Sequence, residues 1–317
     1  MFYLKANEAT LPPAHGSKKG TLLRRELPLH LMLIPAVVLV LIYSYGPMIL
    51  SIFVALQNFV PAKGISGSSW VGLENFQKLF ALPNFGQVVF NTVYISIWKM
   101  VLGVIIPVFF ALLLNEVSNK IFRKVFQTLV YMPNFLSWII IAGILVDILS
   151  PSGGVVNKFL SQFKIEPIFF LGDPKWFPTT IVVSDIWQRF GFGTVVYLAA
   201  LTGIDPALYE AAEIDGANRW EQTIHVTLPA LKGIIVLMTV LSMGNILNAG
   251  FDQIFNLYSP QVYSTGDILD TLIYRLSMEN AQFSLGTAAG LFKSAISFVF
   301  VVLSYYLADK FADYRVF

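Results

Sequence analysis

The sequence contains no cysteine and only three histidines: His15, His30 and His225. Without cysteine, a disulfide, a thiolate nucleophile and a thiolate metal site are all excluded. The three histidines are far apart in the sequence, so a histidine-cluster metal site is not expected either. The sequence therefore gives no reason to assign a metal.

Charged residues are also scarce. They make up 13% of the 317 residues, whereas hydrophobic residues make up 56%. A soluble domain usually carries about 25% charged residues, so this shortage indicates that lipid is the solvent. The formal net charge of +2 is too small to suggest a nucleic-acid partner. Basic residues in a membrane chain more often report its topology.

Sequence patterns of an enzyme are missing as well. There is no Gly-x-x-x-x-Gly-Lys-Ser/Thr loop, so no standard nucleotide site is expected on this chain. Gly191-Phe192-Gly193 lies inside an apolar stretch and is interpreted as a packing or kink element. No Ser-His-Asp set and no paired carboxylates stand in a credible catalytic context. The chain alone is not expected to be an enzyme.

Long apolar stretches dominate what is present. A helix needs about 20 mostly apolar residues to cross a bilayer, because its backbone amides must be bonded within the segment. The fold class predicted is all-α, a polytopic membrane protein with about six transmembrane helices. The predicted spans are 30–57, 88–115, 125–149, 179–203, 230–257 and 286–309.

The first 28 residues are polar and contain five Lys or Arg residues. The apolar run that follows has no small-residue cleavage pattern and is too long for a signal-peptide core. We therefore expect 1–28 to be a cytoplasmic segment, and 29–317 to be the transmembrane domain.

The distribution of Lys and Arg predicts the orientation. With an even number of spans, both termini lie on one side. If that side is the cytoplasm, the cytoplasmic segments hold twelve Lys or Arg residues and the external loops hold six. Because cytoplasmic loops carry an excess of Lys and Arg, both termini are predicted to be cytoplasmic.

The loop between spans four and five, residues 204–229, contains signals for two short helices. Asp205 suits an N-cap and Pro206 the first helical position, so 207–214 is predicted to be a helix. Gly216 is placed to end that helix in a left-handed turn. A second short helix is predicted over 217–224, with Pro229 at the start of span five.

This loop carries a resemblance to a known family. Its spacing is similar to the signature loop of the permease subunits of ATP-binding cassette (ABC) importers. The matching positions are Glu210-Ala211-Ala212, Gly216, Val226 and Leu228-Pro229, with Val226 in place of the usual Ile. Four further segments resemble the carbohydrate branch of this family: 131–138, 255–258, 270–275 and 283–294. Within that branch they are similar to the permeases for polysaccharides and long oligosaccharides, a subgroup that includes the permeases of alginate importers.

The resemblance implies a bacterial inner-membrane subunit that imports a saccharide by alternating access. It implies a second homologous permease, two cytoplasmic ATPase subunits that hold ATP and Mg, and a solute-binding protein. It also implies that the loop docks on an ATPase; the alternative is that its residues only cap and turn the chain. The residues expected at this contact are Glu210, Ala211, Ala212, Asp215, Gly216, Ala217, Trp220, Leu228 and Pro229.

Three cations fall within predicted spans: Lys99, Arg189 and Lys293. A basic residue at mid-bilayer costs about 2.5–3.5 kcal/mol on insertion scales, so these side chains should face protein or water. Arg189 has Asp185 one turn earlier on the same helix, which makes a structural ion pair the favoured alternative. Lys99 has no such partner on its own span, and a role in the substrate pathway stays open for it. Lys293 could either line the pathway or snorkel to the membrane interface.

Span five carries a polar series at steps of three, four and four residues. These steps predict that all four side chains share one helical face, which lines either a substrate cavity or a helix interface. The residues are Asn245, Asn248, Asp252 and Asn256. Trp187 and Phe251 are candidates for stacking on sugar rings, with core packing as the alternative. A cationic interior with amide partners suits an acidic saccharide such as alginate.

Two other classes of protein were weighed. A secondary transporter driven by an ion gradient needs buried carboxylates, and Asp147, Asp185 and Asp252 are candidates. That class does not account for the 204–229 loop. A membrane scaffold accounts for neither the loop nor the charges within spans.

Overall fold

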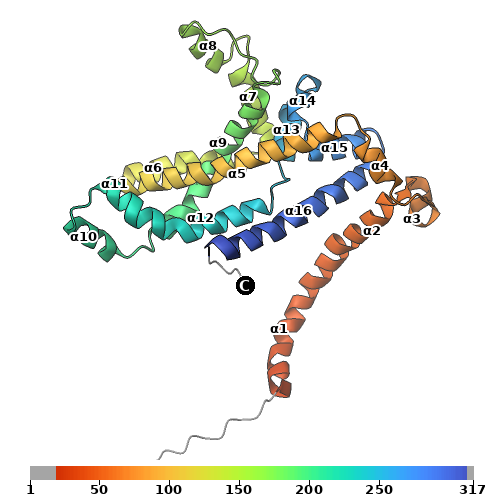
Figure 1. Cartoon of the computed structure of the whole chain (residues 1–317), viewed down its shortest axis with the longest axis horizontal. Helices are drawn as coiled ribbons and strands as arrows, with labels where there is room; N and C mark the ends of the chain where they lie inside the picture. Colours follow the sequence, from red (N-terminus) through yellow and green to blue (C-terminus); the bar gives the residue numbers. More distant parts are fainter. Residues whose placement is uncertain (1–18, 313–317) are drawn as a thin grey trace, which may run out of the picture. The chain divides into compact units, whose positions relative to one another are not determined.

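Figure 1 shows the computed structural model of the chain. It describes the backbone of residues 19–312 and the side chains of residue 28 and residues 30–306. The predicted cytoplasmic position of both termini lies outside the described residues. The chain divides into two compact units, Met1–Ser51 and Ile52–Phe317.

The first unit is one helical stretch. Helix α1 (Lys19–Val40) passes through a π-helical turn, η1 (Leu41–Tyr45), into α2 (Gly46–Ala55), whose last residues belong to the second unit. Residues His30–Ala55 are long and apolar enough to cross a membrane, in agreement with the span predicted at 30–57. The helix itself begins at Lys19, before the predicted span boundary.

The second unit is built around four long helices, with α5 and α9 packed against each other and α12 and α16 side by side (Figure 1). Their bounds are α5 (Phe85–Glu116), α9 (Phe177–Leu201), α12 (Leu228–Met243) and α16 (Phe283–Ala312). One apolar cluster between α5, α9 and α12 contains Ala111, Tyr197 and Leu231, all almost fully buried. The prediction of an all-helical polytopic fold is confirmed.

The third predicted span is not one straight helix. Residues 120–149 form α6 (Lys120–Tyr131), a 3-10 turn η3 (Met132–Phe135) and α7 (Trp138–Leu149). The two halves are bent by 104°. Pro133 lies in the turn, and Ser137 caps the new helix by accepting a bond from the Ile140 amide at 3.5 Å. The predicted span at 125–149 is thus a bent pair of helices, because a proline and a new N-cap interrupt the apolar stretch.

The fifth predicted span is also interrupted. Helix α12 ends at Met243, and a new helix, α13 (Phe251–Leu257), begins only after Gly250. Gly250 has a φ of 95°, a left-handed conformation that favours glycine. Of the four polar residues predicted to share one helical face, Asn245 and Asn248 therefore lie in the break, and Asp252 and Asn256 lie on α13.

Short elements gather at one end of the second unit, near α4 and α15 in Figure 1. Residues 57–80 contain β1 (Gln57–Asn58), η2 (Pro61–Lys63), α3 (Gly64–Gly67), β2 (Ser69–Trp70) and α4 (Glu74–Phe80), with β1 and β2 antiparallel. Residues 258–282 contain η5 (Pro260–Val262), α14 (Tyr263–Gly266), α15 (Leu269–Tyr274) and η6 (Arg275–Glu279). The Phe59 amide donates to Ser284 Oγ at 2.8 Å, which ties the first of these segments to the start of α16.

The opposite end carries α10 (Pro206–Ile214), α11 (Arg219–Gln222) and η4 (Thr223–Thr227). The end of α5 lies beside them, since Arg219 and Glu116 approach to 3.8 Å. Loops predicted to share one side of the membrane thus lie at the same end of the unit. The remaining helix, α8 (Val155–Gln162), follows α7.

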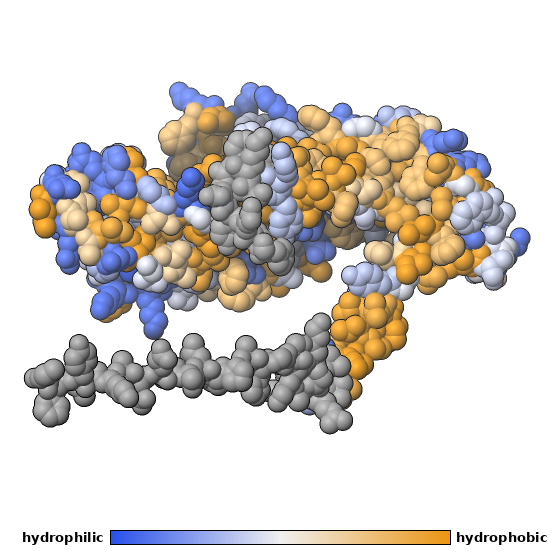
Figure 2. Space-filling view, turned by 60° about the horizontal axis from the view of Figure 1, so that its bottom comes forward, coloured by the Kyte–Doolittle hydropathy of each residue, from blue (hydrophilic) through white to orange (hydrophobic). Residues whose placement is uncertain are grey.

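Within the described residues, four helices are long and apolar enough to cross a membrane. The number rises to six if each of two bent helix pairs is counted as one span. Figure 2 shows orange, hydrophobic residues over much of the surface of the second unit, and blue residues mainly toward its ends. This distribution fits a protein whose middle lies in lipid.

Candidate functional site

Helix α10 forms as the sequence predicts. Asp205 Oδ1 accepts a hydrogen bond from the Ala207 amide at 3.0 Å, and Pro206 occupies the first helical position. Gly216 ends the helix with a φ of 83°. The predicted helix at 207–214 and the predicted left-handed turn are both confirmed.

The second predicted helix of this loop is not separate from span five. Asn218 is its N-cap, and Asn218 and Glu221 form a reciprocal capping box. From Arg219 the chain continues through η4 into α12 as one stretch that ends at Met243. Pro229 lies in the first positions of α12, as predicted, but the helical stretch that contains it already begins at Arg219.

Polar contacts within the 204–229 loop brace it internally. The hydroxyls of Tyr209 and Thr227 lie 3.0 Å apart, and Gln222 Nε2 donates to the Ala217 carbonyl at 3.1 Å. Trp220 is 71% exposed and can serve as an apolar anchor for another protein. Of the residues expected at the ATPase contact, six are exposed, and Ala212, Ala217 and Leu228 are half-buried.

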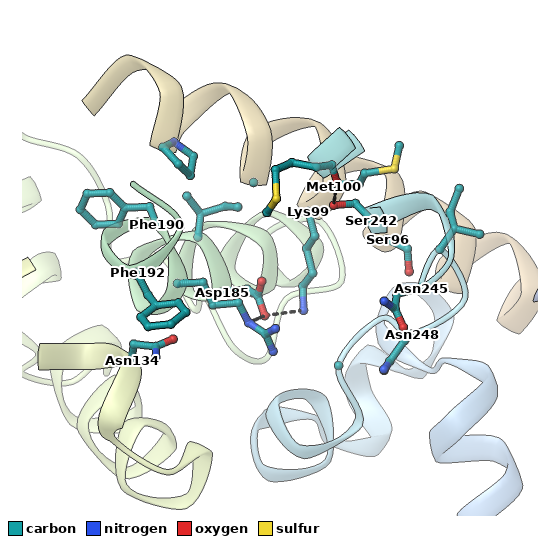
Figure 3. A pocket seen from close by; sticks show the side chains of 18 residues that line it. Ser96, Lys99, Met100, Asn134, Asp185, Phe190, Phe192, Ser242, Asn245 and Asn248 are labelled. Carbon is teal, nitrogen blue, oxygen red and sulfur yellow. Dashed lines mark hydrogen bonds and ion pairs between the residues drawn. The ribbon is translucent and has the colours of Figure 1, made fainter. Parts of the chain in front are cut away.

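A cavity of about 530 Å³ lies between α5, α9, η3 and the interrupted fifth span (Figure 3). Its polar wall combines amides, hydroxyls and charges. These side chains are Ser96, Lys99, Asn134, Asp185, Arg189, Ser242, Asn245 and Asn248. Phe190 and Phe192 add apolar surface. A cavity with amide and hydroxyl groups beside aromatic rings offers the contacts that a sugar requires.

An ion network joins two walls of this cavity. Asp185 Oδ1 lies 3.3 Å from Lys99 Nζ and 3.3 Å from Arg189 Nε. The predicted pairing of Arg189 with Asp185 is thus confirmed, and Lys99 joins it from α5. The Lys99 and Asp185 side chains are 9% and 8% exposed, whereas that of Arg189 is 60% exposed.

The structure brings half of the expected pathway residues together. Lys99, Arg189, Asn245 and Asn248 line the cavity. The other four lie outside its lining: Asp252, Asn256, Lys293 and Trp187. Both Asp252 and Asn256 are exposed on α13, because the helix break turns that helix away from the phase of α12.

Lys293 lies elsewhere, paired with Asp270 of α15 at 2.5 Å. Sequence reasoning missed Gln253, which is fully buried beside the cavity and bonded to Lys99. The only feature of the sequence that could have pointed to Gln253 is that it is a polar residue next to Asp252 in a mostly apolar stretch.

A second polar cluster lies in the 258–275 segment. The Arg275 guanidinium pairs with Asp267 at 2.5 Å and lies 4.7 Å from the centre of the Tyr263 ring. Burial raises the pKa of Tyr258, with a further contribution from Tyr263. Burial lowers the pKa of Arg275, but the hydrogen bond to Asp267, the charge of Asp267 and the nearby Tyr263 and Tyr258 together outweigh burial, and the net shift is upward. Arg275 therefore stays cationic and Tyr258 neutral near pH 7, as a structural cluster requires.

Within the described residues, no three His, Cys, Asp or Glu side chains are grouped so that they could hold a metal ion. The titratable groups in the cavity are paired cations and a carboxylate. The fold and site together define a helical membrane transport subunit with a polar cavity and an exposed loop at 204–229.

Comparison with known proteins identifies the family. A family profile described as "Binding-protein-dependent transport system inner membrane component" matches residues 103–313. The chain belongs to this family: it is a sugar permease of the type I ABC importers, located in the inner membrane and not itself an enzyme.

Several characterised proteins are similar over nearly the whole chain. The polygalacturonan/rhamnogalacturonan transport system permease protein YteP of Bacillus subtilis (strain 168) is 39% identical over 285 residues, 90% of this chain and 88% of that protein. A chain in the crystal structure of a bacterial ABC transporter that imports the acidic polysaccharide alginate is 37% identical, with a TM-score of 0.84, covering 93% of this chain and 99% of that chain. A second alginate transporter structure, in complex with an alginate pentasaccharide-bound periplasmic protein, is 36% identical with a TM-score of 0.86, covering 95% and 100%.

Proposed function

We propose that this chain is one of two permease subunits in an ATP-driven importer that carries an acidic oligosaccharide by alternating access. The observation that carries the proposal is the exposed, internally braced helix α10 at one end of the helical unit. A short helix docked on an ATPase can transmit motion only if it moves rigidly with the spans. The capping of α10 and the Tyr209–Thr227 contact support that rigidity.

The partners follow from the same proposal. Two cytoplasmic ATPase subunits hold ATP and Mg and contact the loop around Glu210. A homologous permease completes the pathway, and a solute-binding protein delivers the saccharide. The periplasmic protein bound in a similar alginate transporter supports this last partner.

The polar cavity is the proposed saccharide path. Asn245 and Asn248 present side-chain amides to it, and amides can donate and accept hydrogen bonds with sugar hydroxyls. Phe190 and Phe192 offer the apolar surface that the faces of sugar rings prefer. The cavity lies beside the break in the fifth span, where the backbone is not helical.

The charges of the cavity favour an acidic saccharide. Lys99 and Arg189 contribute two positive charges and Asp185 one negative charge, which leaves one positive charge in excess. Arg189 reaches Asp185 through Nε, and no hydrogen bond from its terminal nitrogens to a described residue is found. Those nitrogens are suited to a sugar carboxylate. Similar permeases are named for polygalacturonan and alginate, both of which carry uronic acids.

Co-purification tests the coupling assignment. The complex is purified from its native membrane with wild-type chain, Glu210→Gln, Gly216→Ala, or Glu213→Gln as a matched control on the same helix. We expect a P-loop ATPase to co-purify with the wild type and with the Glu213→Gln control. In Glu210→Gln and Gly216→Ala, we expect either less ATPase to co-purify or ATP-dependent uptake to be reduced. If ATPase association and uptake both survive in Glu210→Gln and Gly216→Ala, the coupling assignment is wrong.

A further inference from the structure

The break in the fifth span, residues 244–250, is held by groups from two other helices. Between α12 and α13 the backbone forms turns, with the Asn245 amide bonded to the Ser242 carbonyl at 3.0 Å and the Asn248 amide to the Asn245 carbonyl at 2.8 Å. Non-helical backbone at membrane depth is tolerated where protein or a cavity satisfies its polar groups. The break therefore needs partners from elsewhere in the fold.

Lys99 supplies these partners from α5. Its Nζ donates to the Ala249 carbonyl at 2.7 Å, to Gln253 Oε1, and to Asp185 Oδ1 at 3.3 Å. An ammonium group has three donors, so these three acceptors use its full capacity. Lys99 is saturated and nearly buried, and it has no donor left for a saccharide.

The residues around Lys99 are shaped to this contact. A Cβ at Gly250 would lie 2.9 Å from Lys99 Nζ, and its φ of 95° also disfavours any other residue. Gln253 is fixed from its other side, because its Nε2 donates to the Ile181 carbonyl and to Ser184 Oγ, each at 2.8 Å. The break is thereby joined to both α5 and α9.

We propose that Lys99 is a positioning residue that holds the fifth span open at 244–250, so that Asn245 and Asn248 face the cavity. Both asparagines lie inside the break and both are exposed to the cavity. Lys99 acts through the backbone at Ala249 and does not contact the saccharide. Its effect on transport rests on the proposed function, but its effect on the break does not.

The local charges make Lys99 testable by substitution. In Lys99→Met, Asp185 still has Arg189 as a counter-ion, so no carboxylate is left unpaired in the cavity. The bonds lost are those to Ala249, Gln253 and Asp185, and the cavity also loses the charge of Lys99. Lys293→Met is the matched control, since Lys293 is also a membrane-embedded lysine paired with an aspartate, but outside the cavity lining.

Because the chain has no cysteine, a single reporter cysteine can be placed without background. Asn248→Cys reports on the break, and Ser242→Cys reports on the cavity wall in the intact helix α12. Reaction with a water-soluble methanethiosulfonate is followed in membrane vesicles that contain the whole complex. We expect Lys99→Met to slow the reaction at position 248 by about tenfold, the size of one charge-assisted hydrogen bond, with position 242 unaffected.

Two comparisons decide the labelling result. Lys99→Arg, which keeps the charge and the donors, should restore most of the reaction rate at position 248, and Lys293→Met should not change it. An unchanged rate at position 248 in Lys99→Met, or an equal change at both reporter positions, overturns the proposal.

Uptake provides the functional measurement, with an alginate pentasaccharide as the probe and rates normalised to the amount of assembled complex. Lys99→Met should raise KM about tenfold with a smaller change in kcat, because the asparagines bind but do not drive the cycle. Since this variant also removes the excess positive charge of the cavity, Lys99→Met should raise KM for the neutral maltopentaose as well if positioning is lost. A fall in kcat at constant KM contradicts the positioning role. If even the wild type imports no saccharide, the proposed function fails, while the labelling result still decides the role of Lys99.

Discussion

At the scale of single residues, the central feature is the Asp185 carboxylate with two cations on one oxygen. An ion within the membrane is costly unless it is paired or faces water. Lys99 meets this condition by full hydrogen bonding, and Arg189 meets it partly by exposure to the cavity. The two basic residues thus share one carboxylate but differ in burial, with side chains that are 9% exposed for Lys99 and 60% exposed for Arg189.

Arg189 carries the selectivity prediction. In Arg189→Gln the cavity loses its excess positive charge, so uptake of an alginate pentasaccharide should fall relative to maltopentaose by about ten- to hundredfold, the value of one bidentate charged contact. Competition between the two sugars in vesicles measures this ratio. Arg189→Lys keeps the charge without the planar fork and should give an intermediate ratio. Equal ratios in the wild type and Arg189→Gln would show that Arg189 does not select the carboxylate.

The residue pairs differ in how far sequence could predict them. Arg189 and Asp185 are four positions apart on one helix, and helical spacing alone brings them together. Lys99 and Asp185 are 86 positions apart, and their contact depends on how α5 packs on α9. Periodicity carries no information about that packing, so Lys99 could not be assigned a partner beforehand.

At the scale of elements, hydropathy predicted the length of the apolar stretches but not their continuity. The stretches at 125–149 and 230–257 are both long and mostly apolar, yet each is interrupted. Pro133 was a visible signal for the first interruption and Gly250 for the second. Local capping was predicted correctly at Asp205 and Gly216, because caps depend only on neighbouring residues.

Gly191 carries a prediction about helix packing. A Cβ at this position would lie 2.2 Å from the backbone oxygen of Val130, so α9 approaches α6 too closely for any other residue. Gly191→Ala should lower the thermal stability of the detergent-solubilised complex by several degrees, as expected for an overpacked core at about 1–3 kcal/mol. Gly233→Ala is the matched control, since nothing lies within 4 Å of its Cβ. If both variants melt at the same temperature as the wild type, the close approach is absent.

At the scale of the whole molecule, the helical unit has two chemically different ends. One end carries the 204–229 loop beside Glu116, and the other carries the short elements at 57–80 and 258–282. The alternation of spans predicted which loops share a side, and the structure places the 204–229 loop beside the end of α5. The cavity, by contrast, is formed by parts of four elements and could not be located from any single stretch of sequence.

The most direct test of the account is energy-dependent uptake by the purified complex in liposomes, with its binding protein and an alginate pentasaccharide. The account predicts uptake that requires ATP in the compartment facing the ATPase subunits and that persists when ionophores collapse all ion gradients. Uptake that proceeds without ATP and stops when the gradients are collapsed would contradict it, and would identify an ion-driven secondary transporter instead.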